Sequence, residues 1–307
     1  MTPTSVQPGG VGWCGQAELA WARWRRAWLR CCRPGYVRRM AEKRQGRCEA
    51  CPHDVIDSRD LKYCRNVCGY WFRPEDDPFR WREHLGLARA GLAELVIGTL
   101  LFLAVVVPLS VAASAWHAAL WIPVTALTVV WLWMVSFFRD PTRTIPTDPQ
   151  ALLSPADGTV TDVGEVAEPD FPGGRAFRVS IFLSIFNVHV NRVPCSGRVV
   201  TVRYFRGAFL DARHPECAAR NEQLWIDFEE AGTGQPLRVK QISGAIARRI
   251  VCHLKPGEEV KAGDRFGMIK FGSRTEVLLP VRANLDVQVK VGDKVKGGAT
   301  VLLRYGK

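Results

Sequence analysis

Residues 95–138 read LVIGTLLFLAVVVPLSVAASAWHAALWIPVTALTVVWLWMVSFF and contain no Asp, Glu, Lys or Arg. One membrane-spanning helix needs about 20 apolar residues, so this stretch is long enough for two. Polar or helix-breaking residues near its middle indicate the turn: Pro108, Ser110, Ser114 and His117. We therefore predict two transmembrane helices, at about 92–114 and 116–138, in preference to one buried helical hairpin of a soluble domain.

Basic residues lie on both sides of this apolar stretch, whereas its short turn has none. Arg80, Arg82 and Arg89 precede it, and Arg139 and Arg143 follow it. The positive-inside rule therefore places both ends in the cytoplasm. We expect the cell (inner) membrane as the location, with the following domain on the cytoplasmic side. The composition, 47% hydrophobic and 23% charged, excludes a disordered chain or a fibre.

The segment 1–46 is strongly basic, with nine Lys or Arg and two Glu, and it supplies +7 of the net charge of +12. Tryptophans alternate with arginines over Trp21–Arg30, which is typical of a basic amphipathic helix on an anionic membrane surface. A disordered tail, or a mis-assigned start with the true one at Met40, explains the composition as well. Nucleic acid attracts such charge too, but we expect no nucleic-acid partner.

The segment 47–91 contains Cys48-x-x-Cys51 and Cys64-x-x-x-Cys68, with 12 residues between the two pairs. Two such pairs can supply four thiolates to a tetrahedral structural zinc, with His53 as a spare ligand. Disulfides are disfavoured because the predicted topology exposes the segment to the reducing cytoplasm. An iron–sulfur cluster and free cysteines are the alternatives. A metal would hold together a segment that is too short for its own core.

The remaining residues, 140–307, predict a mainly β domain, because short apolar runs alternate with turn signals. Two Gly-rich segments, Gly257–Gly263 and Gly292–Gly298, each precede an apolar run and form a weak internal repeat. The repeat favours a barrel or sandwich built from hammerhead-type hairpins. The predicted strands are Arg178–Leu183, Arg198–Phe205, Gln223–Phe228, Leu237–Ile242, Ile246–His253, Thr275–Pro280, Leu285–Val291 and Thr300–Arg304.

Four short motifs occur in order in this part of the chain. They are Phe137-Phe-Arg-Asp-Pro-Thr-Arg143, Ser154-Pro-Ala-Asp-Gly-Thr159, Phe182-Leu-Ser-Ile-Phe-Asn-Val-His-Val-Asn-Arg-Val-Pro194 and Arg265-Phe-Gly-Met-Ile-Lys-Phe-Gly-Ser-Arg-Thr-Glu276. Together, after a membrane hairpin, they resemble the phosphatidylserine decarboxylase family. The similarity is to its short, archaeal-type branch, which has a Gly-Ser-Arg processing site. It covers about residues 92–307 and does not extend to 1–91.

The Gly272–Ser273 bond follows an apolar run, and a strained turn there lets a serine hydroxyl approach the preceding carbonyl. Attack by Ser273 would convert the peptide to an ester, and β-elimination would then break the chain. The resemblance implies this self-cleavage, which gives chains 1–272 and 273–307 that stay together. The small chain then begins with a pyruvoyl cofactor derived from Ser273. Its ketone forms a Schiff base with the substrate amine and accepts the electrons released with CO2.

Proton transfer needs a second residue, and His189 is our candidate both for cleavage and for decarboxylation. Asp157 is predicted to orient it, as in a catalytic triad. The longer bacterial branch of the family has two histidines in this motif, whereas this chain has Asn191 and Arg192 where the second one falls. The division of the proton-transfer roles therefore stays open.

Three further residues are predicted to contact the substrate. Ile185 and Phe186 supply apolar surroundings that favour loss of a charged carboxylate. Arg274 binds a substrate carboxylate or phosphate, or else pairs with Glu276.

The resemblance implies decarboxylation of phosphatidylserine to phosphatidylethanolamine and CO2. A hairpin that leads directly into the catalytic domain fits a membrane phospholipid substrate, and a homo-oligomer is compatible with the sequence. One alternative is a pyruvoyl decarboxylase of another amino-acid-derived substrate. A non-enzymatic, membrane-tethered adaptor with a zinc module and a β-sandwich is the other.

Overall fold

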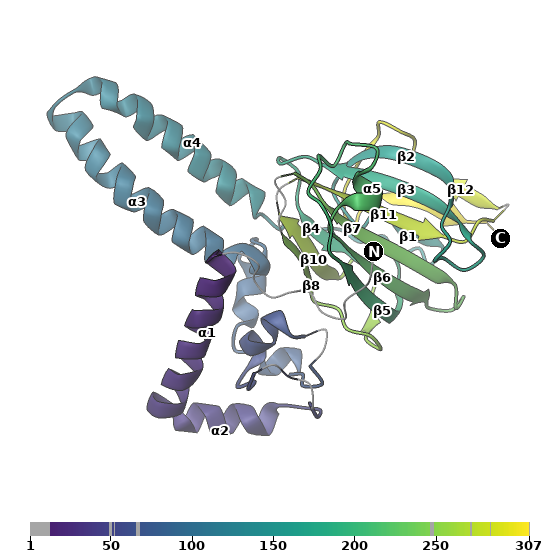
Figure 1. Cartoon of the computed structure of the whole chain (residues 1–307), viewed down its shortest axis with the longest axis horizontal. Helices are drawn as coiled ribbons and strands as arrows, with labels where there is room; N and C mark the ends of the chain where they lie inside the picture. Colours follow the sequence, from purple (N-terminus) through teal and green to yellow (C-terminus); the bar gives the residue numbers. More distant parts are fainter. Residues whose placement is uncertain are drawn as a thin grey trace.

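The structure is a computed structural model that describes residues 13–48, 51, 53–65, 68–245, 249–270, 272–282 and 284–306. It has an N-terminal helical region, a long helical hairpin and a β domain (Figure 1). The N-terminal region contains α1 (Trp13–Cys32), α2 (Pro34–Lys43) and the short 3-10 helices η1 (Ser58–Tyr63), η2 (Pro74–Asp76), η3 (Arg80–His84) and η4 (Arg89–Gly91).

Helix α1, which contains the predicted helical run Trp21–Arg30, packs against the Cys-rich segment, so the alternative of a disordered tail does not hold for residues 13–43. Arg25 is buried and forms ion pairs with Asp57 and with Asp60, at 3.6 Å from the latter. Arg26 pairs with Asp60 at 3.3 Å, and the Tyr36 hydroxyl donates to Asp57 at 2.8 Å. Buried carboxylates need such partners, so the arginines that resembled a charged tail are bound to acids about 30 residues later. Residues 1–12 of the predicted tail lie outside the described residues.

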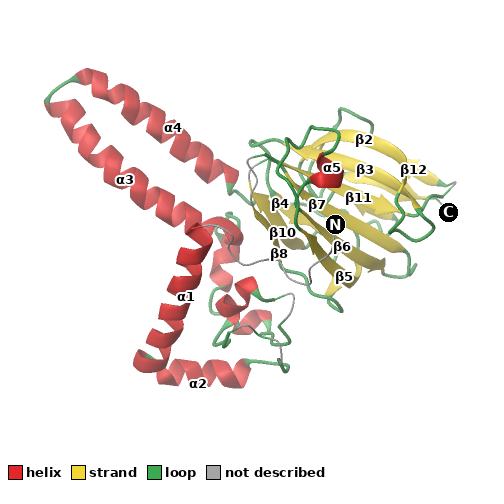
Figure 2. Ribbon diagram, viewed as in Figure 1, coloured by secondary structure: helices red, strands yellow, loops and turns green. Residues whose placement is uncertain are grey.

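The apolar stretch forms α3 (Leu92–Ala115), η5 (Ala118–Leu120) and α4 (Trp121–Phe137), close to the predicted bounds. The two helices contact each other through Phe102 and Trp131, whose rings stack 5.0 Å apart, and Trp131 donates to Thr99 at 3.0 Å. Most outward apolar side chains are exposed, and Ile122 is 73% exposed. Figure 2 shows the hairpin projecting from the β domain. Both helices are long and apolar enough to be candidate membrane spans.

The β domain is a curled, half-barrel antiparallel sheet with two small sheets on its inner face, so the mainly β prediction is confirmed. Within the described residues the large sheet has the strand order β13-β2-β3-β11-β7-β6-β5-β9, and the small sheets have the orders β1-β14-β12 and β4-β10-β8. Helix α5 (Cys217–Arg220) lies between β5 and β6. The strands are β1 (Ala151–Leu153), β2 (Gly158–Ala167), β3 (Arg175–Leu183), β4 (Val190–Arg192), β5 (Gly197–Phe205), β6 (Gln223–Glu230), β7 (Pro236–Ser243), β8 (Arg249–Cys252), β9 (Glu259–Val260), β10 (Arg265–Lys270), β11 (Ser273–Leu279), β12 (Leu285–Val287), β13 (Lys294–Val295) and β14 (Val301–Tyr305).

The strand order reveals that the weak sequence repeat is part of a larger one. Reading the large sheet from either edge gives β13-β2-β3-β11 and β9-β5-β6-β7, and the central strands of the small sheets, β14 and β10, follow the edge strands β13 and β9. The turns match as well, because Leu153 donates to the Pro194 carbonyl at 2.9 Å and Arg192 donates to the Pro155 carbonyl at 2.9 Å. Two seven-strand units therefore face each other, with β4–β10 inserted between β3 and β11.

The core lies between the half-barrel and the small sheets. Its residues come from the inner face of the large sheet, such as Ile181 and Val277, and from the small sheets, such as Phe266 and Leu302. Strand β11 is buried on both faces along most of its length.

The short strands β1, β4, β9 and β13 were not predicted, and two longer segments need correction. Strand β2 was not predicted, because Asp162, Gly164 and Glu165 resemble a turn, whereas they lie on a strand with one partly solvent-exposed face. The predicted strand Leu285–Val291 ends at Val287, because the Lys290 and Asp293 backbones form a turn. The first residues of predicted strand Ile246–His253, 246–248, lie outside the described residues.

Candidate active site

The Gly272–Ser273 bond joins two strands of different sheets. Gly272 has a φ of +62°, a left-handed conformation that favours glycine. Ser273 begins β11, in register with Leu183 of β3 and Ser243 of β7. The Gly244 backbone lies against the Gly272 carbonyl, since a Cβ at Gly244 would be 2.4 Å from that oxygen. The bond is thus held in a fixed, unusual backbone conformation between two neighbouring strands.

The Ser273 hydroxyl points to the core side of the sheet and is fully buried. Its Oγ has no hydrogen-bond partner among the described residues, and neither do Thr275 Oγ1 and Gln241 Oε1. Thr275 is two residues after Ser273 on the same face, and Gln241 is its register partner on β7. An unpaired buried polar group costs about 1–3 kcal/mol, so a cluster of them indicates a functional site.

Gln241 connects this cluster to the Ser-Pro-Ala-Asp turn. Its Nε2 donates to Asn191 Oδ1 at 2.7 Å, and Asn191 Nδ2 donates to the Pro155 carbonyl at 3.3 Å. No role was predicted for Gln241. The sequence does contain a signal for Gln241: it lies on the inward face of its strand with Leu237 and Val239, where an apolar residue is expected.

His189 lies just before β4 and is buried. Its Nδ1 is 2.9 Å from the Asn187 carbonyl. A carbonyl only accepts hydrogen bonds, so Nδ1 carries the proton and Nε2 has the free lone pair. Nε2 is buried without a partner among the described residues. Burial lowers the pKa of His189 from 6.5 to about 4, so the ring is neutral near pH 7 and Nε2 can accept a proton.

Asp157 was predicted to orient His189, but its carboxylate has two other partners in the described structure. Its Oδ2 accepts from Arg143 at 2.8 Å and its Oδ1 accepts from the Gly297 backbone at 2.8 Å. Arg143 competes for the carboxylate because it is a full cation within contact distance, and the Asn187 carbonyl occupies His189 Nδ1. In the uncut chain Asp157 therefore joins the segment after α4 to the β13–β14 turn.

Arg274 lies on the face of β11 opposite to Ser273 and pairs with Glu276, with Nε 3.0 Å from Oε1. Arg274 was predicted to bind either a substrate anion or Glu276, and the structure contains the ion pair with Glu276. Its Nη1 is also 3.7 Å from the Cys217 sulfur. Glu276 is fixed in turn by Ser180, whose hydroxyl donates to it at 3.1 Å.

Ile185 and Phe186 lie in the loop between β3 and β4. The Ile185 Cγ2 atom is 4.0 Å from the position of a Cβ on Gly272, so Ile185 faces the cleavage site. Phe186 is 68% exposed, and its carbonyl accepts from Arg139 at 2.8 Å. Since Arg139 follows α4, this loop connects the buried Gly272–Ser273 bond to the base of the hairpin.

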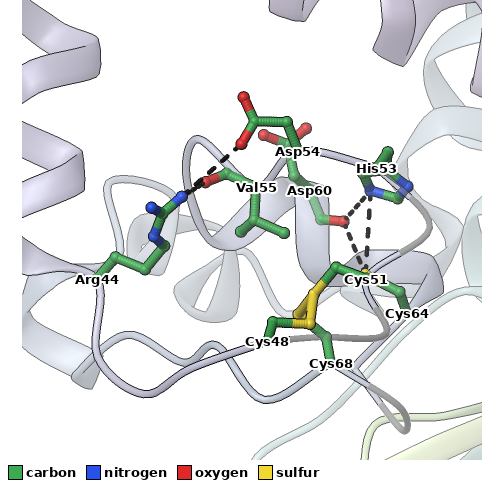
Figure 3. The surroundings of a disulfide bond; sticks show 9 residues. All are labelled: Arg44, Cys48, Cys51, His53, Asp54, Val55, Asp60, Cys64 and Cys68. Atoms are coloured by element: carbon green, nitrogen blue, oxygen red, sulfur yellow. Dashed lines mark hydrogen bonds and ion pairs between the residues drawn. A yellow bond between two sulfur atoms is a disulfide. The ribbon is translucent and has the colours of Figure 1, made fainter.

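Three of the four predicted metal ligands come together (Figure 3). The sulfur atoms of Cys48, Cys51 and Cys68 all lie within 4.8 Å of one another, and Cys51 contacts both of the others. One sulfur can form only one disulfide, so we describe the three as a thiol cluster. Cys64 lies apart from it: its sulfur donates to the Asp60 carbonyl at 3.5 Å and is 4.0 Å from His53 Nε2. Three convergent sulfurs fit a thiophilic metal.

Comparisons with known proteins show the family. A family model described as phosphatidylserine decarboxylase matches residues 131–303. A protein of Rhodopirellula baltica is 44% identical over 247 residues, which is 80% of this chain and 99% of the relative. Proteins of Carboxydothermus hydrogenoformans (48% identical over 176 residues, 57% of this chain and 81% of the relative) and Nitrosomonas eutropha (43% over 187 residues, 60% and 84%) are also similar. All three are named phosphatidylserine decarboxylase proenzyme. The chain therefore belongs to the phosphatidylserine decarboxylase family.

Proposed function

We propose that this protein is a proenzyme that cuts itself at Gly272–Ser273 and then decarboxylates phosphatidylserine to phosphatidylethanolamine and CO2. The observation that carries the proposal is the buried Ser273 hydroxyl, which has no partner in the part of the chain that the structure describes, next to a left-handed Gly272 in a chain whose relatives are named proenzymes. A non-enzymatic adaptor has no use for this arrangement, which costs stability.

The proposed cleavage proceeds through an ester. Ser273 Oγ attacks the Gly272 carbonyl carbon, its proton passes to the lone pair of His189 Nε2, and the peptide bond becomes an ester with a free Ser273 amine. Loss of the Ser273 Cα proton then expels the Gly272 carboxylate and leaves dehydroalanine. Water adds to the tautomeric imine, ammonia leaves, and a pyruvoyl group remains at residue 273.

The pyruvoyl group supplies a ketone that binds the substrate amine and withdraws the electron pair released with CO2. The chain supplies the surroundings. Ile185 and the core face of β11 exclude water, which favours loss of a charged carboxylate. His189 Nε2 would take up the proton that the substrate ammonium group loses on binding the ketone, and would return it to the product carbon after CO2 leaves.

The location of the site fits a lipid substrate. We propose that α3 and α4 cross the inner membrane, with the β domain on the cytoplasmic side. Phe186 and Arg139 then lie at the bilayer surface, where an exposed aromatic ring and a cation suit a phospholipid headgroup. Trp24 and Trp28 of α1, which are exposed and stack with centroids 6.5 Å apart, suit the same anionic surface.

Intact mass analysis of the purified 34.3-kDa chain tests the proposal. We expect two components, residues 1–272 and a small chain 273–307 with a blocked N-terminus. The same preparation should release CO2 from phosphatidylserine in mixed micelles. A pyruvoyl enzyme for another amine would be cut but inactive on phosphatidylserine, whereas an adaptor would stay uncut.

We further propose that the thiol cluster holds one structural zinc ion, with Cys48, Cys51 and Cys68 as ligands and either Cys64 or His53 completing the site. His53 and Cys64 both contact the Asp60 carbonyl, and the Asp60 carboxylate holds α1 through Arg25 and Arg26. The metal would therefore fix the segment on which α1 packs.

Metal analysis tests this second proposal. Wild-type protein should contain about one zinc per chain, because a structural site is closed and binds tightly. Cys51→Ser should lose most of the metal and make α1 sensitive to limited proteolysis. Cys31→Ser removes an exposed thiol outside the cluster and is the matched control. Equal zinc content in both variants would contradict the assignment.

A further inference from the structure

The start of the hairpin is bound to the strand that leads to the cleavage site. Lys270 is the last residue of β10, two residues before Gly272, and it is only 4% exposed. Its ammonium group contacts the carboxylate of Glu94 and donates to the Ala90 carbonyl at 3.1 Å. Glu94 lies in the first turn of α3, which begins at Leu92. A buried ammonium group requires such partners, so this contact fixes the end of β10 to α3.

The end of the hairpin contacts His189, the candidate base. Phe137, the last residue of α4, is buried, and its ring lies 4.2 Å from the His189 ring between centroids. Phe137 belongs to a small core with Val190 of β4 and Met268 of β10. The two ends of the hairpin therefore contact the two elements that the proposed self-cleavage needs, the candidate base and the strand before the scissile bond.

The charges around Lys270 show why Glu94 matters. Lys270 is the register partner of Arg249 on β8, so two cations lie side by side. Like charges directly opposite each other on neighbouring strands repel, and each requires an acid. Arg249 is 3.5 Å from Glu18 of α1, whereas Lys270 contacts Glu94. Glu94 of α3 therefore neutralises Lys270, while Glu18 of α1 lies beside Arg249.

We propose that Glu94, acting through Lys270, is a positioning residue for self-cleavage, so that the hairpin is part of the processing machinery as well as a membrane anchor. This inference rests on the proposed cleavage at Gly272–Ser273. Attack by Ser273 Oγ requires a near-attack geometry, in which a displacement of about 1 Å costs about a hundredfold in rate. Lys270 is close enough along the chain that its release would shift Gly272.

The experiment follows the appearance of the small chain in full-length protein synthesised in the presence of liposomes. Glu94→Gln should slow its release by about tenfold or more, because the amide cannot neutralise Lys270. The reciprocal double variant Glu94→Lys/Lys270→Glu restores an opposite-charge pair and should recover to within about threefold of wild type. Arg304→Gln, which breaks an exposed ion pair with Asp148, is the control and should process normally.

Two further measurements separate positioning from general destabilisation. Decarboxylase activity per processed chain should stay within about twofold of wild type in Glu94→Gln, because the scissile bond no longer exists. The thermal midpoint of Glu94→Gln is measured in the uncut Ser273→Ala background. Normal processing of Glu94→Gln overturns the inference, and so does a reciprocal variant as slow as the single one. Cleavage of Ser273→Ala would instead overturn the proposed cleavage site.

Discussion

Replacing Ser273 by Ala is expected to leave the chain as one uncut polypeptide with no decarboxylase activity. The hydroxyl oxygen attacks the Gly272 carbonyl and then leaves with the Gly272 carboxylate, and this departure creates the dehydroalanine from which the pyruvoyl group forms. One substitution therefore removes both the cleavage and the cofactor. The loss should approach roughly 10⁶-fold, the size observed when an enzyme loses a nucleophilic serine. A denaturing gel, an intact mass and a CO2-release assay measure it.

The substitution should not unfold the protein. Ser273 Oγ makes no hydrogen bond to the described residues, so its removal leaves no partner unpaired, and a methyl group suits the buried face of β11. The thermal midpoint should therefore stay the same or rise. Ser196→Ala, which removes a hydroxyl from the turn before β5, is the control and should be cut normally. Continued cleavage at 272/273 in Ser273→Ala would exclude Ser273 as the nucleophile.

The hairpin and the mainly β domain could be predicted from sequence because each follows from a local pattern. The absence of charge over 95–138 requires a long apolar element, and α3 and α4 fall within a few residues of the predicted bounds. The Gly-rich segments likewise predicted matching hairpins. Their pairing into two seven-strand units was not predictable, because it depends on contacts between strands far apart in the chain.

The candidate site was predicted less completely, since its contacts are long-range. The sequence motif places Asp157 in a turn but does not show that Arg143 takes its carboxylate. Similarly, the arginines of 13–43 resembled a free basic tail, because their acidic partners lie in another segment. Gln241 lay in no motif, and only the strand register places it opposite Thr275, two residues after Ser273.

His189→Gln is expected to slow self-cleavage by about 10²–10⁴-fold, the usual contribution of a general base. The amide keeps the approximate size of the ring but has no basic lone pair. Because burial lowers the pKa of His189 to about 4, the wild-type rate should stay nearly constant from pH 7.5 to about 5 and fall only below that. A His189 with the ordinary pKa of 6.5 would lose rate from pH 7 downward. Unchanged cleavage in His189→Gln would remove its assigned role.

The same shift predicts how stability depends on pH. The pKa of His189 is about 4 in the folded chain and 6.5 in the unfolded chain, so the unfolded state binds the extra proton between these values. Its contribution to stability is complete above about pH 6.5 and falls as the pH drops through about 4, by roughly 3 kcal/mol. Thermal midpoints of Ser273→Ala with and without His189→Gln measure this directly, since neither chain is cut. The acid-induced fall in the thermal midpoint between pH 6.5 and 4 should be smaller in the double variant than in Ser273→Ala alone. Equal falls in the two variants would show that His189 is not the buried, neutral base described above.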